Sequence, residues 1–317
     1  MKKSTFYILF NLMAIGMTFA QNPIIQTNYT ADPAPMVYNG KVYLYTSHDE
    51  DDSTWFTMDD WRLYTTEDMV NWTDHGTVLS YKDFDWAQRN AWAPVTTERD
   101  GKFYMYVPIT DRNGKNGIGV AVADSPYGPF VDPLGKPLIQ ESQADIDPAV
   151  FIDDDGQAYL YWGSGLDWVN GHCFVVKLND DMITFDGEIK DVTPANYFEA
   201  PLMIKRDGTY YLMYSDGKVI EDTYKVRYAT GNNPYGPFTE ASNSPILSTE
   251  TDSITYSPGH HTVFNKNGQD YILYHRHSAN SPNSEDLLRE LCVDSLNFTA
   301  DGLIETVKPS GIAAFEQ

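Results

Sequence analysis

The stretch DPAVFIDDDGQAYLYWG, residues 147–163, decides the fold because the chain carries its pattern five times. Each copy has a short apolar run, a turn that ends in glycine, and then an aromatic-rich run. The turn glycines lie 61, 55, 52 and 60 residues apart, at Gly40, Gly101, Gly156, Gly208 and Gly268. Each follows Asn or Asp, and these dipeptides supply the positive φ that a tight turn between antiparallel strands requires. The flanking runs are rich in Tyr, Val and Phe, as half-buried strands are.

A second sequence feature recurs once after each turn glycine. An aromatic residue closes a further turn 29 to 32 residues after each glycine, at Trp72, Phe130, Phe185, Phe238 and Phe298. Units of this length with about four short strands are typical of propeller blades. We therefore expect an all-β, five-bladed β-propeller that forms a single domain over residues 21–317. A β-sandwich is the alternative, but sandwiches lack such a phased repeat. The sequence leaves open how the ring closes.

Residues 1–20 are typical of a signal peptide. Lys2 and Lys3 precede an apolar stretch from Phe6 to Phe19, and Ala20 is a suitable residue before the cleavage point. The stretch is short and interrupted by polar residues, which argues against a permanent membrane helix. We expect the protein to be exported to the periplasm or the extracellular space.

Composition narrows the class of partner. Cleavage of the predicted signal peptide would remove Lys2 and Lys3. The mature chain would then have 20 basic and 45 acidic residues, and its formal charge would change from −23 to −25. Such a chain repels nucleic acids and anionic membranes, so we expect neither nucleic-acid binding nor membrane insertion. The two cysteines, Cys173 and Cys292, exclude a disulfide scaffold, and whether they pair stays open. The oligomeric state is not indicated.

The repeat predicts which residues meet at the propeller axis. Eight or nine residues before the turn glycines lie Asp32, Trp92, Asp147, Glu199 and His260. A single Asp before Pro is a common turn starter. Three acids at one phase, with no Lys or Arg among them, repel one another and point to chemistry. Glycoside hydrolysis needs one protonated and one ionised carboxyl group, and a third negative group can keep the acid protonated.

Five motifs together carry a family resemblance. They are ADPAP at 31–35, WAP at 92–94, DIDPAVFIDDDG at 145–156, FEAP at 198–201 and SPGHH at 257–261. In order and spacing the chain resembles glycoside hydrolase family 43, five-bladed propeller enzymes that act on arabinose- and xylose-containing plant polysaccharides. Ala93-Pro94-Val95 departs from the many relatives with an acid after the proline, so a polar substrate contact is not expected there.

The resemblance implies an inverting mechanism with assigned roles. Asp32 would be the general base, Glu199 the general acid, and Asp147 would orient Glu199 and raise its pKa. Trp92 matches a position that stacks on or walls the first sugar. Arg289 fits the family's sugar-contacting arginine best, and Arg276 is the second choice.

The remaining candidates are weaker. Trp162, Ser164 and His48 lie at strand ends that face the same side of the predicted propeller. The resemblance also implies a metal ion or water cluster in the axial channel near a histidine after glycine, here His260. Ca²⁺ prefers oxygen ligands, so a single bond from His260 is expected. No other cofactor is expected.

These residues predict a glycosidase that removes arabinofuranosyl or xylosyl units from arabinoxylan, xylan, arabinan or their oligosaccharides. An endo-acting xylanase or arabinanase of the same family is the alternative, because loops 47–60 and 278–288 would decide between a pocket and a cleft. A non-catalytic sugar-binding propeller is a further alternative, although it has no use for a carboxylic acid of raised pKa. A fructan-cleaving propeller is excluded because Asn-Asp-Pro-Asn-Gly, Arg-Asp-Pro and Glu-Cys are all absent at the matching places.

Overall fold

The computed structural model describes residues 22–51, 53–249, 255–278 and 287–310, which are built almost entirely of β-strands. One short 3-10 helix, Tyr81–Asp83, is the exception in these ranges. None of the helical structure in the same ranges is long and apolar enough to cross a bilayer. The predicted signal peptide lies outside the described residues.

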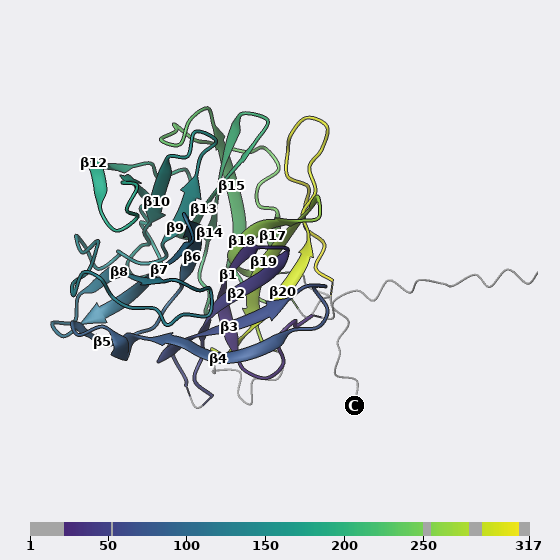
Figure 1. Cartoon of the computed structure of the whole chain (residues 1–317). Helices are drawn as coiled ribbons and strands as arrows, with labels where there is room; N and C mark the ends of the chain where they lie inside the picture. Colours follow the sequence, from purple (N-terminus) through teal and green to yellow (C-terminus); the bar gives the residue numbers. More distant parts are fainter. Residues whose placement is uncertain (1–21, 52, 250–254, 279–286, 311–317) are drawn as a thin grey trace, which may run out of the picture.

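The strands form five antiparallel sheets in chain order, one for each repeat (Figure 1). The first contains β1 (Thr30–Tyr38), β2 (Lys41–His48), β3 (Asp60–Thr66) and β4 (Thr73–Ser80). The second contains β5 (Ala87–Arg89), β6 (Val95–Arg99), β7 (Lys102–Asp111) and β8 (Asn116–Ala123). The third contains β9 (Ala149–Ile152), β10 (Ala158–Trp162), β11 (Phe174–Leu178) and β12 (Phe185–Asp191).

The last two sheets complete the series. The fourth contains β13 (Glu199–Arg206), β14 (Thr209–Asp216), β15 (Lys225–Gly231), β16 (Thr239–Glu240) and β17 (Leu247–Ser248). The fifth contains β18 (Gly259–Lys266), β19 (Gln269–His277) and β20 (Arg289–Ser295). The prediction of an all-β, five-bladed propeller is confirmed, and the sandwich alternative is excluded.

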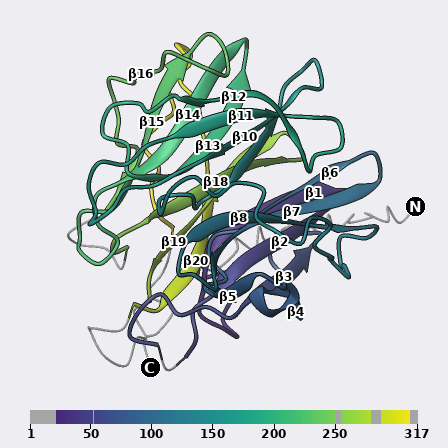
Figure 2. The same cartoon turned by 90° about the vertical axis from the view of Figure 1, so that its left-hand side faces the viewer.

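The first long strand of each blade lies at the centre of the ring. Strands β1, β6, β9, β13 and β18 contact one another in that order, and β18 contacts β1 in turn. In Figure 1 the purple strands of the first blade accordingly lie beside the yellow-green strands of the fifth, and Figure 2 gives the view from the side. Residues at the start of these central strands therefore converge.

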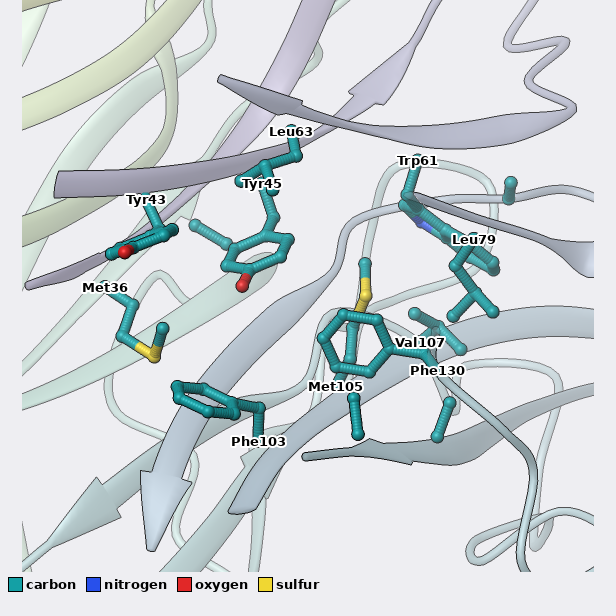
Figure 3. Close-up of a cluster of buried hydrophobic side chains, with 14 of the residues drawn as sticks. Met36, Tyr43, Tyr45, Trp61, Leu63, Leu79, Phe103, Met105, Val107 and Phe130 are labelled. Carbon is teal, nitrogen blue, oxygen red and sulfur yellow. The ribbon is translucent and has the colours of Figure 1, made fainter. Parts of the chain in front are cut away.

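Side chains alternate between the two faces of each blade and fill the spaces between neighbours. Tyr43 and Tyr45 on β2 pack toward the second blade, whereas Val42 and Leu44 on the same strand pack toward the fifth. Figure 3 shows the core between the first and second blades, with Met36, Tyr43, Tyr45, Trp61, Leu63 and Leu79 facing Phe103, Met105, Val107 and Phe130. The aromatic-rich runs of the sequence are thus the cores between blades.

The amino-terminal segment closes the ring. The Ile24 backbone N–H donates to the Leu291 carbonyl at 2.9 Å, and the Val293 N–H donates to Asn22 Oδ1 at 2.9 Å. This segment extends the fifth blade beside β20, so the two ends of the described chain hold one sheet together. Ile24 and Ile25 also enter the core between the fifth and first blades.

Four of the five predicted turns are two-residue turns with positive φ at both central residues, as in Asn39 (50°) and Gly40 (78°). No atom lies within 4 Å of a Cβ built on Gly40, so the backbone conformation alone selects glycine there. The turn before β10 differs. There only Gly156 has positive φ, and the Asp153 N–H donates to the Gln157 carbonyl across a longer loop.

The two cysteines do not pair. Cys173 lies in the core between the third and fourth blades, and Cys292 in the core between the fourth and fifth. Both are free, buried thiols.

Candidate active site

A pocket of about 380 Å³ opens at the centre of the ring. Asp32, Asp147 and Glu199 all line it, although they come from three different blades. The predicted convergence of these three carboxyl groups is therefore what the structure shows.

The backbone turns sharply where the acids enter the pocket. Asp32 (φ 53°), Asp147 (58°), Ala200 (55°) and His260 (42°) occupy equivalent places near the starts of central strands, and all have positive φ. The strand pairing is interrupted at three of these places, between Ala31 and Ala34, Glu199 and Leu202, and Gly259 and Thr262. A left-handed conformation costs about 1 kcal/mol for such residues, and strain of this kind gathers at functional sites.

Asp32 is held as an ionised carboxylate. Ser47 Oγ donates to its Oδ2 at 2.6 Å, Arg289 Nη1 donates to its Oδ1 at 3.0 Å, and His275 Nδ1 lies 3.1 Å from the same oxygen. Burial by itself raises the pKa of Asp32, but the Arg289 charge opposes it and the pKa lies well below its usual value. Asp32 is thus ready to accept a proton at neutral pH.

The pKa of Glu199 is shifted in the opposite direction. Tyr224 Oη donates to its Oε1 at 2.7 Å, and Ser164 Oγ donates to its Oε2 at 3.1 Å. Enclosure in the pocket raises the pKa of Glu199 to about 7, against the lowering effect of these two hydrogen bonds. A carboxyl group with this pKa retains a proton for part of the time at neutral pH and can donate it.

Asp147 links the other two acids. Its Oδ2 accepts from the Ala200 backbone N–H at 3.2 Å and lies 3.8 Å from His260 Nδ1. The same His260 nitrogen lies 3.4 Å from Asp32 Oδ1. Burial and the charges of Glu199 and Asp32 raise the pKa of Asp147 well above its usual value. Asp147 therefore fixes the backbone next to Glu199 and favours retention of a proton between the two groups.

The two candidate arginines have different surroundings. Arg289 lines the pocket and donates from Nε and Nη2 to Asp49 at 3.0 and 2.7 Å, which leaves Nη1 for Asp32. Arg276 is outside the pocket lining and is 1% exposed, with its guanidinium bound to Glu290 at 2.7 Å. The arginine beside the acids is thus Arg289.

The other predicted contacts also separate into two groups. Trp92 and Ser164 line the pocket. Trp162 is outside that lining, because its ring packs in the core between the second and third blades and its Nε1 donates to Asp145 at 3.0 Å. His48 points away as well, and its Nδ1 lies 2.9 Å from Asp60 Oδ1 and 3.7 Å from Glu50. Strand-end position alone does not tell which face a side chain takes.

Of the two histidines after Gly259, His260 lines the pocket and His261 lies outside its lining. His260 lines the pocket between Asp32 and Asp147. His261 is 4% exposed, and neither of its ring nitrogens has a hydrogen-bond partner among the described residues. Burial and the neighbouring His260 lower the pKa of His261 to about 3, so it is neutral and able to ligate at neutral pH.

A second group of possible metal ligands lies on the first blade. His48, Glu50 and Asp60 have ligand atoms within 4.8 Å of one another, but Arg62 and Thr77 also contact Asp60.

The described part of loop 47–60, which was expected to help decide between a pocket and a cleft, forms one wall of the pocket. Trp55, Phe56 and Met58 line the pocket on this side, and Trp168 lines it from the loop of the third blade. The rings of Phe56 and Trp168 are 6.2 Å apart, so the loops of the first and third blades contact each other at the pocket. Loop 278–288 lies largely outside the described residues.

Sequence reasoning missed Tyr224, His275, Asp49, Phe56 and Trp168. His275 has a recognisable position, at the end of the QDYILYH run of the fifth repeat. Tyr224 and Asp49 have none, because they lie in segments that differ in length from blade to blade. Their role depends on contacts with residues from other blades.

Comparison with known proteins gives consistent matches. The model of the family described as glycosyl hydrolases family 43 matches residues 20–304. A xylosidase/arabinosidase of Bacteroides ovatus is 36% identical, with 90% of this chain and 97% of that protein covered. The crystal structure of a family 43 β-xylosidase/α-arabinofuranosidase from a compost metagenome, a calcium-free complex with xylotriose, is 34% identical with a TM-score of 0.78, covering 91% and 97%. An α-L-arabinofuranosidase of Clostridium thermocellum is 36% identical with a TM-score of 0.73, covering 91% and 96%.

Proposed function

Because the chain belongs to glycosyl hydrolases family 43, we propose that it removes terminal arabinofuranosyl or xylosyl units from arabinoxylan, xylan or arabinan with inversion. The chain is a glycosidase, and its relatives include xylosidase/arabinosidases. One observation carries the mechanism. Asp32, of lowered pKa, and Glu199, of raised pKa, line a single pocket and so supply a base and an acid at the same pH.

In this mechanism Asp32 takes a proton from water as the water oxygen bonds to the anomeric carbon. The bond from that carbon to the leaving oxygen breaks on the opposite face, and Glu199 gives its proton to that oxygen. Asp32 is then protonated and Glu199 ionised, and exchange with solvent restores both. Asp147 holds the backbone beside Glu199, and Arg289 holds Asp32 in place.

The contact between Phe56 and Trp168 supports release of terminal units. The two loops meet on one side of the pocket, where a polymer bound across an open cleft would have to pass. A pocket of about 380 Å³ suits one or two sugar rings. Export to the periplasm or outside the cell, based on residues 1–20, is part of the same proposal because polysaccharide substrates do not enter cells.

A substrate panel tests the proposal. We expect monosaccharide release from 4-nitrophenyl α-L-arabinofuranoside or 4-nitrophenyl β-D-xyloside, and from arabinoxylan or xylo-oligosaccharides. NMR of the first sugar formed should show the anomer opposite to that of the substrate. Oligosaccharide products from linear arabinan or xylan would indicate endo action, and a retained anomer would overturn the inverting mechanism.

The expected bond from His260 to calcium remains a prediction, and the ligand that we propose from its surroundings is the adjacent His261. Its two ring nitrogens are buried without partners in the described part of the chain, which suits a metal or a water cluster. Ca²⁺ prefers oxygen, so His261 would supply one nitrogen and water the other ligands. When bound, the ion would add positive charge beside His260, which lines the pocket.

We expect millimolar Ca²⁺ to raise the melting temperature of the chelator-treated protein by about 5 °C if its concentration is about 100 times Kd. His261→Ala should abolish this shift, because the only nitrogen ligand is lost. His172→Ala, which removes an exposed imidazole paired with Asp191, serves as the control and should keep it. An equal shift in all three proteins would dismiss His261 as a ligand.

A further inference from the structure

Tyr224 contacts the groups around both catalytic carboxyls from outside the pocket lining. It is fully buried in the segment before β15. Its hydroxyl donates to Glu199 Oε1 at 2.7 Å. Its ring stacks on the imidazole of His275, with centroids 5.9 Å apart and an interplanar angle of 8°.

His275 continues the connection to the base. Its Nδ1 lies 3.1 Å from Asp32 Oδ1. A continuous set of contacts thus runs from Glu199 through Tyr224 and His275 to Asp32, and it leaves the pocket free for substrate. Burial and the nearby Glu199 charge raise the pKa of Tyr224 well above its usual value, so the hydroxyl remains a donor throughout the working pH range.

The backbone is shaped to admit this ring. A Cβ on Gly259 would lie 2.1 Å from Cε1 and 2.3 Å from Cδ1 of Tyr224, so only glycine fits at the start of β18. The preceding loop is also fixed, since the Lys218 N–H donates to Thr223 Oγ1 at 3.0 Å. The tyrosine is therefore held from both sides.

We propose that Tyr224 is a positioning residue that sets the arrangement of the acid Glu199 relative to the base Asp32. Its hydroxyl positions Glu199, and its ring, stacked on His275, positions Asp32. This inference rests on the proposed glycosidase function. The two contacts are separable, because phenylalanine keeps the ring and removes only the hydroxyl.

Tyr224→Phe tests the hydroxyl. A hydrogen bond to a carboxylate stabilises its ionised form, so loss of the bond raises the pKa of Glu199. The other groups that face Glu199 are unchanged: Ser164 as a donor, Asp147 and Asp32 as like charges, and Arg289 as the opposing charge. We expect the basic limb of the kcat/KM profile to move up by about one pH unit, with kcat reduced severalfold.

Tyr224→Leu tests the ring. Because the stack is also lost, we expect kcat to fall at least about tenfold below that of Tyr224→Phe. This additional loss should persist with a 2,4-dinitrophenyl glycoside, whose leaving group needs little protonation, since it arises at Asp32. Gly259→Ala, which pushes the ring aside, should give the same result without changing the tyrosine.

The control is Tyr228→Phe, four residues further along the chain. The Tyr228 hydroxyl donates to Asn243 Oδ1 at 2.6 Å, and neither residue lines the pocket. Its pH profile should equal that of the wild type. A basic limb that does not move in Tyr224→Phe, or equal kcat values for the phenylalanine and leucine variants, would overturn the inference. A wild-type protein without activity on any glycoside would instead overturn the proposed function.

Discussion

Glu199→Gln is expected to lower kcat about 10³-fold on xylosides or arabinofuranosides with poor leaving groups, because the amide cannot protonate the departing oxygen. One of the two hydroxyls that donate to Glu199, those of Tyr224 and Ser164, can still donate to the amide oxygen, and the other can accept from the amide nitrogen, so the side chain should keep its place. Steady-state kinetics with a series of aryl glycosides measures the effect. The loss should shrink to about tenfold or less for a 2,4-dinitrophenyl leaving group, which departs without a proton.

The pH dependence of the wild type follows from the same group. The acid must be protonated, so activity should fall as the pH rises through the pKa of Glu199, near 7. The base must be ionised, and the pKa of Asp32 lies well below its usual value, so activity should persist into acidic solution. In Glu199→Gln the basic limb should disappear.

Glu188→Gln is the matched control, because Glu188 is exposed on β12 at the outer edge of the third blade. It should retain wild-type kinetics. A loss in Glu199→Gln that is equal for good and poor leaving groups would contradict the role of general acid.

Asp32→Asn should reduce kcat by about 10³- to 10⁴-fold, because the other two acids that line the pocket among the described residues, Asp147 and Glu199, have raised pKa values and cannot replace it as the base. In contrast to Glu199→Gln, the loss should be the same for every leaving group. Arg289 keeps its bonds to Asp49, so the variant should still fold. Circular dichroism and thermal unfolding check this point.

Asp100→Asn makes the same acid-to-amide change in a hairpin turn away from the pocket. An Asn-Gly turn already occurs at Asn39-Gly40, so this control should be active and stable. A leaving-group dependence in Asp32→Asn like that of Glu199→Gln, or more than about a tenth of wild-type activity, would contradict the role of general base.

The sequence predicted the fold because its main determinants are local. The Asn-Gly and Asp-Gly turns need positive φ wherever they occur, and the alternation on strands such as β2 determines which neighbouring blade each side chain faces. The phase of the repeat then placed Asp32, Asp147 and Glu199 in one pocket, since equivalent residues of a ring converge at its axis. The repeat does not predict the loops between blades, which differ in length and sequence.

What the sequence by itself determined is the number of blades, their order and the three acids that meet. Only the tertiary structure decided that Arg289 rather than Arg276 lies beside Asp32, that Trp162 is buried in a core, and that residues 22–24 close the ring. It also decided that Tyr224 joins Glu199 to His275. The physical reason is the distance in sequence over which each interaction acts. A turn or an alternating strand depends on neighbours in the chain, whereas protonation state and side-chain direction depend on groups from other blades.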